Sequence, residues 1–106
     1  MSEINNIVEQ VRLATDYQIN KQILREKILT DLHVPYNGGL FKVTPEIIMF
    51  ANLQTLNENF YLEDVYHNPI HIVNPIEFTK LCNEHYQKVM NRWHQEHNEL
   101  KQIRKV

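Results

Sequence analysis

Histidine is the residue of this 106-residue sequence with the widest range of possible chemistry, and it occurs six times. Imidazole nitrogens bind zinc and related metals. His94 and His97 are three residues apart, as are Cys82 and His85, and on a helix this spacing puts both members of a pair on one face. However, His85 and His97 would be about 18 Å apart along one helix axis, so the two pairs do not form one site.

Sequence motifs that assemble metal ligands on helices are absent. A carboxylate-bridged metal pair needs Glu-x-x-His on two helices, but the residue three before His94 is Asn91, and the residue three before His97 is His94. His-Glu-x-x-His does not occur either. His67 and His71 flank a predicted turn, where polar side chains are expected. We therefore predict no metal and no cofactor, with a small histidine-dependent metal protein as an alternative.

Cys82 is the only cysteine, and a catalytic cysteine needs a lowered pKa and a neighbouring base. It lies on the apolar stripe of a predicted helix, so we interpret it as a small core residue. Glu63 and Asp64 are the only adjacent carboxylates. Neighbouring residues of a strand point to opposite faces, which argues against an acid–base pair and favours an exposed strand end. We predict no catalytic residue and a protein that is not an enzyme.

Basic residues gather at the C-terminal end, where Lys101, Arg104 and Lys105 fall in the last turn of a predicted helix and Arg92 lies further back. Cations at this end complement the helix dipole. A nucleic-acid surface would combine a basic face with aromatic side chains, which this cluster lacks. A nucleic-acid-binding regulator that uses these four residues is thus an alternative, which the net charge of −2 does not favour.

The N-terminal third predicts one long helix over residues 3–33, which ends before Pro35 because proline disfavours helical geometry in the preceding residue. Its apolar residues recur at spacings of three and four. They are Ile4, Ile7, Val8, Val11, Ala14, Tyr17, Leu24, Ile28 and Leu32. Gln18 and Lys21 interrupt this stripe, so two helices joined near Asp16 are the alternative.

The central third predicts short elements, because its apolar runs are brief and bounded by turn residues. They are a turn at 36–39, a strand at 40–43, a helix from Thr44 to near Leu56, and a hairpin with strands 60–65 and 70–73. The short helix would be buried through Ile47, Ile48, Phe50 and Leu53. We expect the strand at 40–43 to join the hairpin in a three-stranded sheet. One α+β domain over residues 1–106, in the order α-β-α-β-β-α, follows.

The last third predicts a second long helix over residues 74–106, since Asn74 can cap it, Pro75 suits its first turn, and no further Pro or Gly occurs. Such a helix is about 45 Å long, more than a domain of this size can cover. Its first half is broadly apolar, whereas its second half carries a narrow seam typical of packing against another helix. The residues predicted at this interface are Tyr86, Val89, Trp93, Glu96, Leu100 and Ile103.

The sequence leaves three alternatives for the element that packs on this seam: the N-terminal helix of the same chain, a second copy, or a foreign protein. We expect a homodimer with Leu100 and Ile103 near the interface. No apolar run reaches the roughly 18 residues of a membrane span. The single cysteine fits a reducing compartment, so a cytoplasmic protein is expected.

Several short stretches resemble small uncharacterised proteins of contractile-tailed phages, over about residues 40–100. The stretches are Phe41-Lys42-Val43-Thr44-Pro45-Glu46-Ile47-Ile48, Asn68-Pro69-Ile70, Asn74-Pro75-Ile76-Glu77-Phe78 and Tyr86…Met90…Trp93-His94. The resemblance implies an accessory or assembly role in a phage. It assigns no functional residue. A non-enzymatic interaction protein, acting through self-association or partner docking, is the function that we predict.

Overall fold

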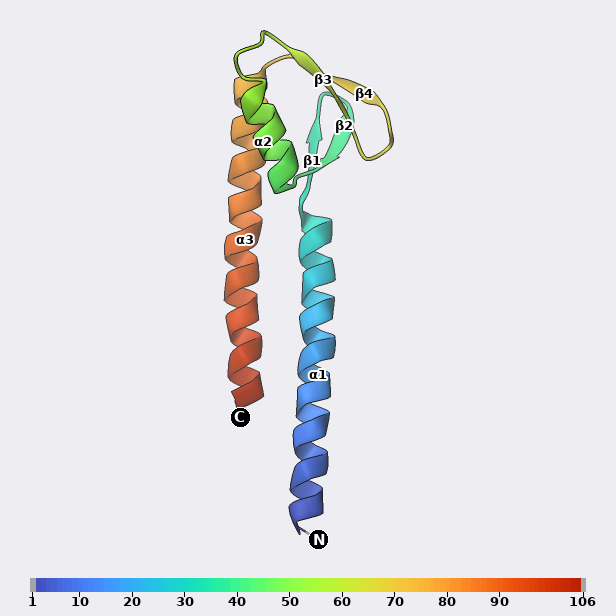
Figure 1. The fold of residues 1–106 in the computed structure, drawn as a ribbon, viewed down its shortest axis with the longest axis vertical. Coiled ribbons are helices and arrows are strands. Elements are labelled where there is room, and N and C mark those ends of the chain that lie inside the picture. Colours follow the sequence, from blue (N-terminus) through green and yellow to red (C-terminus); the bar gives the residue numbers. More distant parts are fainter. Residues whose placement is uncertain (1, 106) are drawn as a thin grey trace.

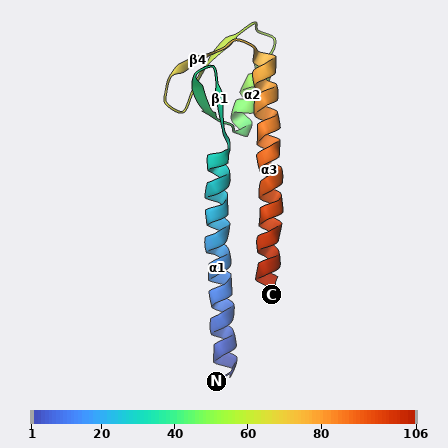
Figure 2. The same cartoon turned by 180° about the vertical axis from the view of Figure 1, so that it is seen from behind.

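Two long helices and a small head make up the molecule (Figure 1). The computed structural model describes the backbone of residues 2–105 and the side chains of residues 4–102. Helices α1 (Ser2–Asp31) and α3 (Pro75–Lys105) run antiparallel, side by side, and the intervening chain forms the head at one end (Figures 1 and 2). The molecule measures 71 × 23 × 18 Å, and its radius of gyration of 20.0 Å exceeds the roughly 13 Å of a compact domain of similar length. We call the pair of long helices α1 and α3 the helical arm. Much of this arm therefore has no further layer of structure packed over it.

The head consists of two β-hairpins and one short helix. Its elements are β1 (His33–Tyr36), β2 (Gly39–Lys42), α2 (Pro45–Leu53), β3 (Phe60–Glu63) and β4 (Pro69–Ile72). Strands β1 and β2 are antiparallel with Tyr36 opposite Gly39, and β3 and β4 are antiparallel with Phe60 opposite Ile72. The predicted α+β class and element order are confirmed, with one strand, β1, added. The N-terminal helix is a single helix and not two.

The predicted three-stranded sheet is wrong, because the strands form two separate two-stranded sheets. The added strand β1 pairs with β2 through a tight turn at Asn37 and Gly38, which have φ angles of 47° and 82°. Positive φ at both central residues is the geometry of the tight hairpin turn that Asn-Gly favours. This turn pairs one edge of β2 with β1, and the other edge meets the second hairpin only through hydrogen bonds of Leu40 with Asp64 and Val65.

Asp64 joins the two hairpins. Its Oδ2 accepts a hydrogen bond from the Leu40 N–H at 3.1 Å, and its Oδ1 accepts from the Tyr66 and Asn68 N–H groups at 3.0 Å. The Val65 N–H donates to the Leu40 carbonyl at 2.9 Å. Asp64 is only 6% exposed, so the expectation of an exposed strand end at this carboxylate is wrong. Its three acceptor contacts satisfy backbone groups that no ladder pairs.

Replacing Asp64 with asparagine should lower the melting temperature at neutral pH, because an amide cannot accept all three backbone hydrogen bonds. These bonds, foremost that from Asn68, hold the pKa of Asp64 below its ordinary value of 3.8. Ionised Asp64 therefore stabilises the fold above about pH 3.8, and this stabilisation is lost as the pH falls further through the folded-state pKa. Thermal melts of both proteins should converge toward acid pH. The neighbour variant Glu63→Gln removes only an exposed ion pair with His67, so it should change the melting temperature little. A melting-temperature deficit of Asp64→Asn that grows in acid would contradict the role given to the ionised carboxylate.

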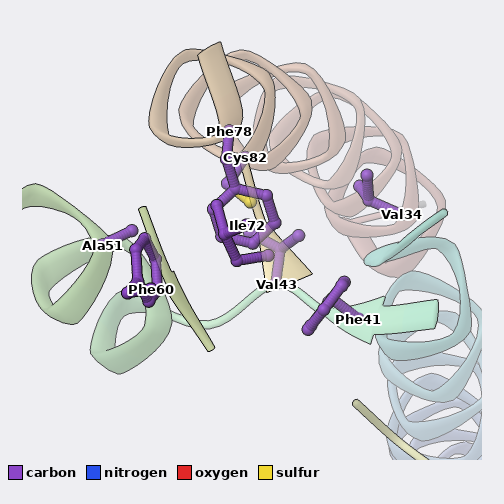
Figure 3. Packing of buried hydrophobic residues seen from close by; sticks show 8 residues of the cluster. All are labelled: Val34, Phe41, Val43, Ala51, Phe60, Ile72, Phe78 and Cys82. Atoms are coloured by element: carbon purple, nitrogen blue, oxygen red, sulfur yellow. The ribbon is translucent and has the colours of Figure 1, made fainter. Parts of the chain in front are cut away.

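The main core lies where the first turns of α3 meet the head (Figure 3). Eight buried residues form it: Val34, Phe41, Val43, Ala51, Phe60, Ile72, Phe78 and Cys82. The ring of Phe78 is fully buried and makes edge-to-face contacts with Tyr36, Phe41 and Phe60, at centroid distances of 5.0, 5.3 and 6.4 Å. Burial raises the pKa of the Cys82 thiol to about 11, so this side chain is a neutral core residue at neutral pH.

Helix α2 is less buried than its sequence predicts. Thr44 caps it as expected, accepting the Ile47 N–H on its Oγ1 at 3.2 Å. Only Ala51 is buried, however, and the helix ends at Leu53 instead of Leu56. Phe50 is 42% exposed and Leu53 is 71% exposed. Because α2 lies at the side of the head against α3, with solvent beyond it, the expected burial of these two residues is wrong (Figure 1).

Candidate self-association surface on the helical arm

The residues predicted at an interface pack mostly against α1 of the same chain. A second cluster holds the two long helices together through Leu24, Ile28, Leu32 and Val89, with Leu29, Tyr86, Met90, Trp93 and Leu100 packed around them. The Glu96 Oε1 lies 3.4 Å from the Lys27 Nζ. The side chain of Ile103 is outside the described residues. The seam is thus occupied by the N-terminal helix, the first of the three occupants considered, and a homodimer needs another surface.

Polar contacts fix the junction between arm and head. His85 Nε2 donates to the Asp31 carbonyl at 2.7 Å, and Arg92 forms an ion pair with the Asp31 carboxylate. Arg92, named in the nucleic-acid alternative, therefore has a structural partner on α1. Lys101 is exposed, whereas the side chains of Arg104 and Lys105 lie outside the described residues.

A second apolar face of α1 remains uncovered by this chain. We name it the outer stripe, and it consists of Ile4, Ile7, Val8, Val11, Ile19 and Ile23, which are between 52% and 60% exposed. At about 100° per residue, Val8 and Ile19 lie roughly opposite the side of α1 that carries Leu24, Ile28 and Leu32. Ile4, Val11 and Ile23 lie between the two sides, and Ile7 lies closer to the packed side. The first turns of α1 also extend past the end of α3 (Figures 1 and 2). Helix α1 therefore exposes aliphatic side chains both along the turns that α3 does not reach and beside the cluster that packs on α3.

A row of charges accompanies the outer stripe. Arg12 pairs with Glu9 through a hydrogen bond of 3.1 Å from its Nε, and its Nη1 lies 3.6 Å from the Asp16 carboxylate. The hydrogen bond from Arg12 lowers the pKa of Glu9 below its ordinary value. The stripe thus combines exposed aliphatic side chains with charges of both signs, as protein interfaces do at their rims.

Sequence spacing alone placed Ile4, Ile7, Val8 and Val11 in one stripe with Leu24, Ile28 and Leu32, so the outer stripe was not predicted. The signal that distinguishes the two faces is Ile19 and Ile23, which follow Val11 at helical spacing but fall away from Leu24 and Ile28.

Other candidate sites are weaker. Within residues 4–102, no three His, Cys, Asp or Glu side chains are close enough together to hold a metal ion. None of the described helices combines the length and apolarity that a bilayer crossing requires. Comparison with known proteins adds no further constraint, since no protein family, curated protein or solved structure matches this chain.

Proposed function

We propose that this protein is a non-enzymatic interaction protein that dimerises through the outer stripe of α1. The observation that carries the proposal is the exposure of six aliphatic side chains along α1, four of them in the turns that α3 does not reach and two beside the packed cluster. The apolar stripe of an amphipathic helix is normally buried against another element. Burying a Val or Ile side chain completely stabilises by about 1.5 to 3 kcal/mol, so covering this face supplies a driving force for association.

The spacing of the stripe is self-complementary. In an antiparallel pair with its two-fold axis between residues 13 and 14, Ile4 lies opposite Ile23 of the second copy, and Val8 lies opposite Ile19. The same axis brings Arg12 near Asp16 of the second copy, so charges of opposite sign meet at the centre. A two-fold contact requires such a surface, in which each patch matches itself. From Ile4 to Ile23 the stripe is about 28 Å long, enough for an extended helix pair.

We favour a second copy over a foreign helix as the partner, because the stripe's own residues supply both sides of the antiparallel pairing. The accessory or assembly role in a contractile-tailed phage and the cytoplasmic location belong to this proposal as predictions. A nucleic-acid regulator has less support, since Arg92 is paired with Asp31.

The double variant Val8→Glu/Ile19→Glu should convert the protein from dimer to monomer on light scattering, because it places like charges where apolar side chains would meet. Helical circular dichroism should be unchanged, since both positions are exposed in the single chain. The matched control is Leu53→Glu, which alters a still more exposed apolar residue on α2 and should remain dimeric. Wild-type protein that is monomeric at high micromolar concentration would refute the proposal. Dissociation by Leu53→Glu alone would move the interface to α2.

A further inference from the structure

The two sides of the helical arm differ in charge. On one side, a groove between α1 and α3 has a volume of about 400 Å³. We name it the cationic groove, and it is lined by Gln18, Lys21, Gln22, Arg25, Met90, Trp93, His94 and His97. On the other side, a shallower groove of about 320 Å³ is lined in part by Lys27, Glu96 and Glu99. The first groove has no carboxylate among its lining residues, whereas the second has two.

The permanent cations of the cationic groove lack partners among the described residues. Lys21 and Arg25 are one helical turn apart, and neither forms an ion pair within residues 4–102. Arg12, Lys27 and Arg92 of the arm each pair with a carboxylate, whereas Lys88 and Lys101, like Lys21 and Arg25, form no ion pair within residues 4–102. Two unpaired like charges on one wall attract an anion, and a guanidinium can bind two phosphate oxygens at once.

Trp93 gives the groove a second recognition element. It is half-buried, it belongs to the packed cluster of the arm, and it lines the same groove as Lys21 and Arg25. An indole face held by packing is a stacking platform for a planar heterocycle. The amides of Gln18 and Gln22 add donors and acceptors for the polar edge of such a ring. A volume of about 400 Å³ is in the range of small-molecule sites.

We propose that the cationic groove binds a nucleoside phosphate, with its base on Trp93 and its phosphate on Lys21 and Arg25. A nucleotide is the ligand class that uses both elements, because inorganic phosphate leaves the indole unused and a nucleoside leaves the two cations unused. None of the lining residues belongs to the outer stripe.

Trp93 is the only tryptophan of the sequence, so its fluorescence reports directly on the groove. Titration with AMP and with ADP should give saturable quenching, and calorimetry should return the same dissociation constants. Adenosine and inorganic phosphate should each bind about tenfold more weakly or worse, because each loses one of the two contacts. Arg25→Glu should weaken AMP binding by a similar factor. Lys88→Glu makes the same charge change outside the groove and should leave the affinity unchanged.

Several results would overturn the assignment. They are no saturable response to millimolar AMP or ADP, equal affinity for phosphate and AMP, or an equal loss in Lys88→Glu and Arg25→Glu. Tighter binding of a short single-stranded oligonucleotide than of either mononucleotide would replace the mononucleotide site by a nucleic-acid surface. Unchanged AMP affinity in the monomeric Val8→Glu/Ile19→Glu variant is expected, and loss of binding there would show that the groove needs the dimer.

Discussion

Replacing Phe78 with alanine is expected to cost about 4 kcal/mol of unfolding free energy, the largest loss that a single truncation in this chain should cause. The ring is fully buried and contacts three other aromatic rings, which come from β1, β2 and β3. Removing it opens a cavity at the point where both hairpins meet α3. Since small domains are stable by only about 5 to 15 kcal/mol, much of the reserve disappears.

Urea denaturation followed by circular dichroism measures this loss, and Phe50→Ala is its matched control. Phe50 is 42% exposed and has one ring contact, with Phe60 at 5.7 Å, so we expect a cost of about 1 kcal/mol. Equal losses for the two variants would mean that Phe78 is not the centre of the core.

Replacing Ile28 with aspartate should separate α1 from α3 while leaving the head and the first turns of α3 folded. Ile28 is completely buried between α1 and α3, and a charge placed there has no described partner. Burying an unpaired carboxylate costs several kcal/mol, which is comparable to what the buried side chains of this small cluster contribute. The main core, in contrast, contains no residue of α1.

Hydrogen exchange separates these two outcomes. Amides of α1 should exchange much faster in Ile28→Asp, whereas amides of β2 and of the first turns of α3 should keep their protection. Ile76→Asp is the control, because Ile76 is 67% exposed on α3 and its replacement should change neither region. Simultaneous loss of protection in arm and head would show that the molecule unfolds as one cooperative unit.

Local signals in the sequence predicted the long helices well. Asn74 caps α3 through a bond of 3.1 Å to the Glu77 N–H, and Thr44 caps α2, so both helix starts are encoded by residues a few positions apart. The hairpin at β3 and β4 follows from alternating apolar runs around a polar turn, and Pro69 lies at the strand start as expected.

Features that depend on distant contacts were missed. Strand β1 was not predicted, because Pro35 was interpreted only as the end of the N-terminal helix. The Asn37-Gly38 pair nevertheless is a strong hairpin signal. The burial of Asp64 depends on Leu40, 24 residues away, and no local pattern predicts that contact. For α2, an apolar composition predicted burial, yet the head is too small to cover Phe50 and Leu53.

At the candidate interface, too, the local pattern was predicted correctly but the packing partner was not. The sequence predicted that Trp93 and Leu100 pack on a helix, but the helix is α1 of the same chain. Once that face is filled, the free surface moves to the outer stripe, whose position depends on how α1 rotates against α3. A single helical pattern does not contain that information, because Ile7 and Tyr17 both continue it.

The distance between spin labels on the two copies of α1 tests the proposed dimer most directly. Cysteines introduced at Thr15 and at Asn5, in separate variants, accept the label, whereas the buried Cys82 thiol with its pKa of about 11 does not. In the antiparallel pair, labels at position 15 should be about 5 Å apart along the helix axis and labels at position 5 about 26 Å apart. A short distance at 15 with a long distance at 5 is the predicted result. Equal distances at both positions, or no coupling between copies at either, would contradict it.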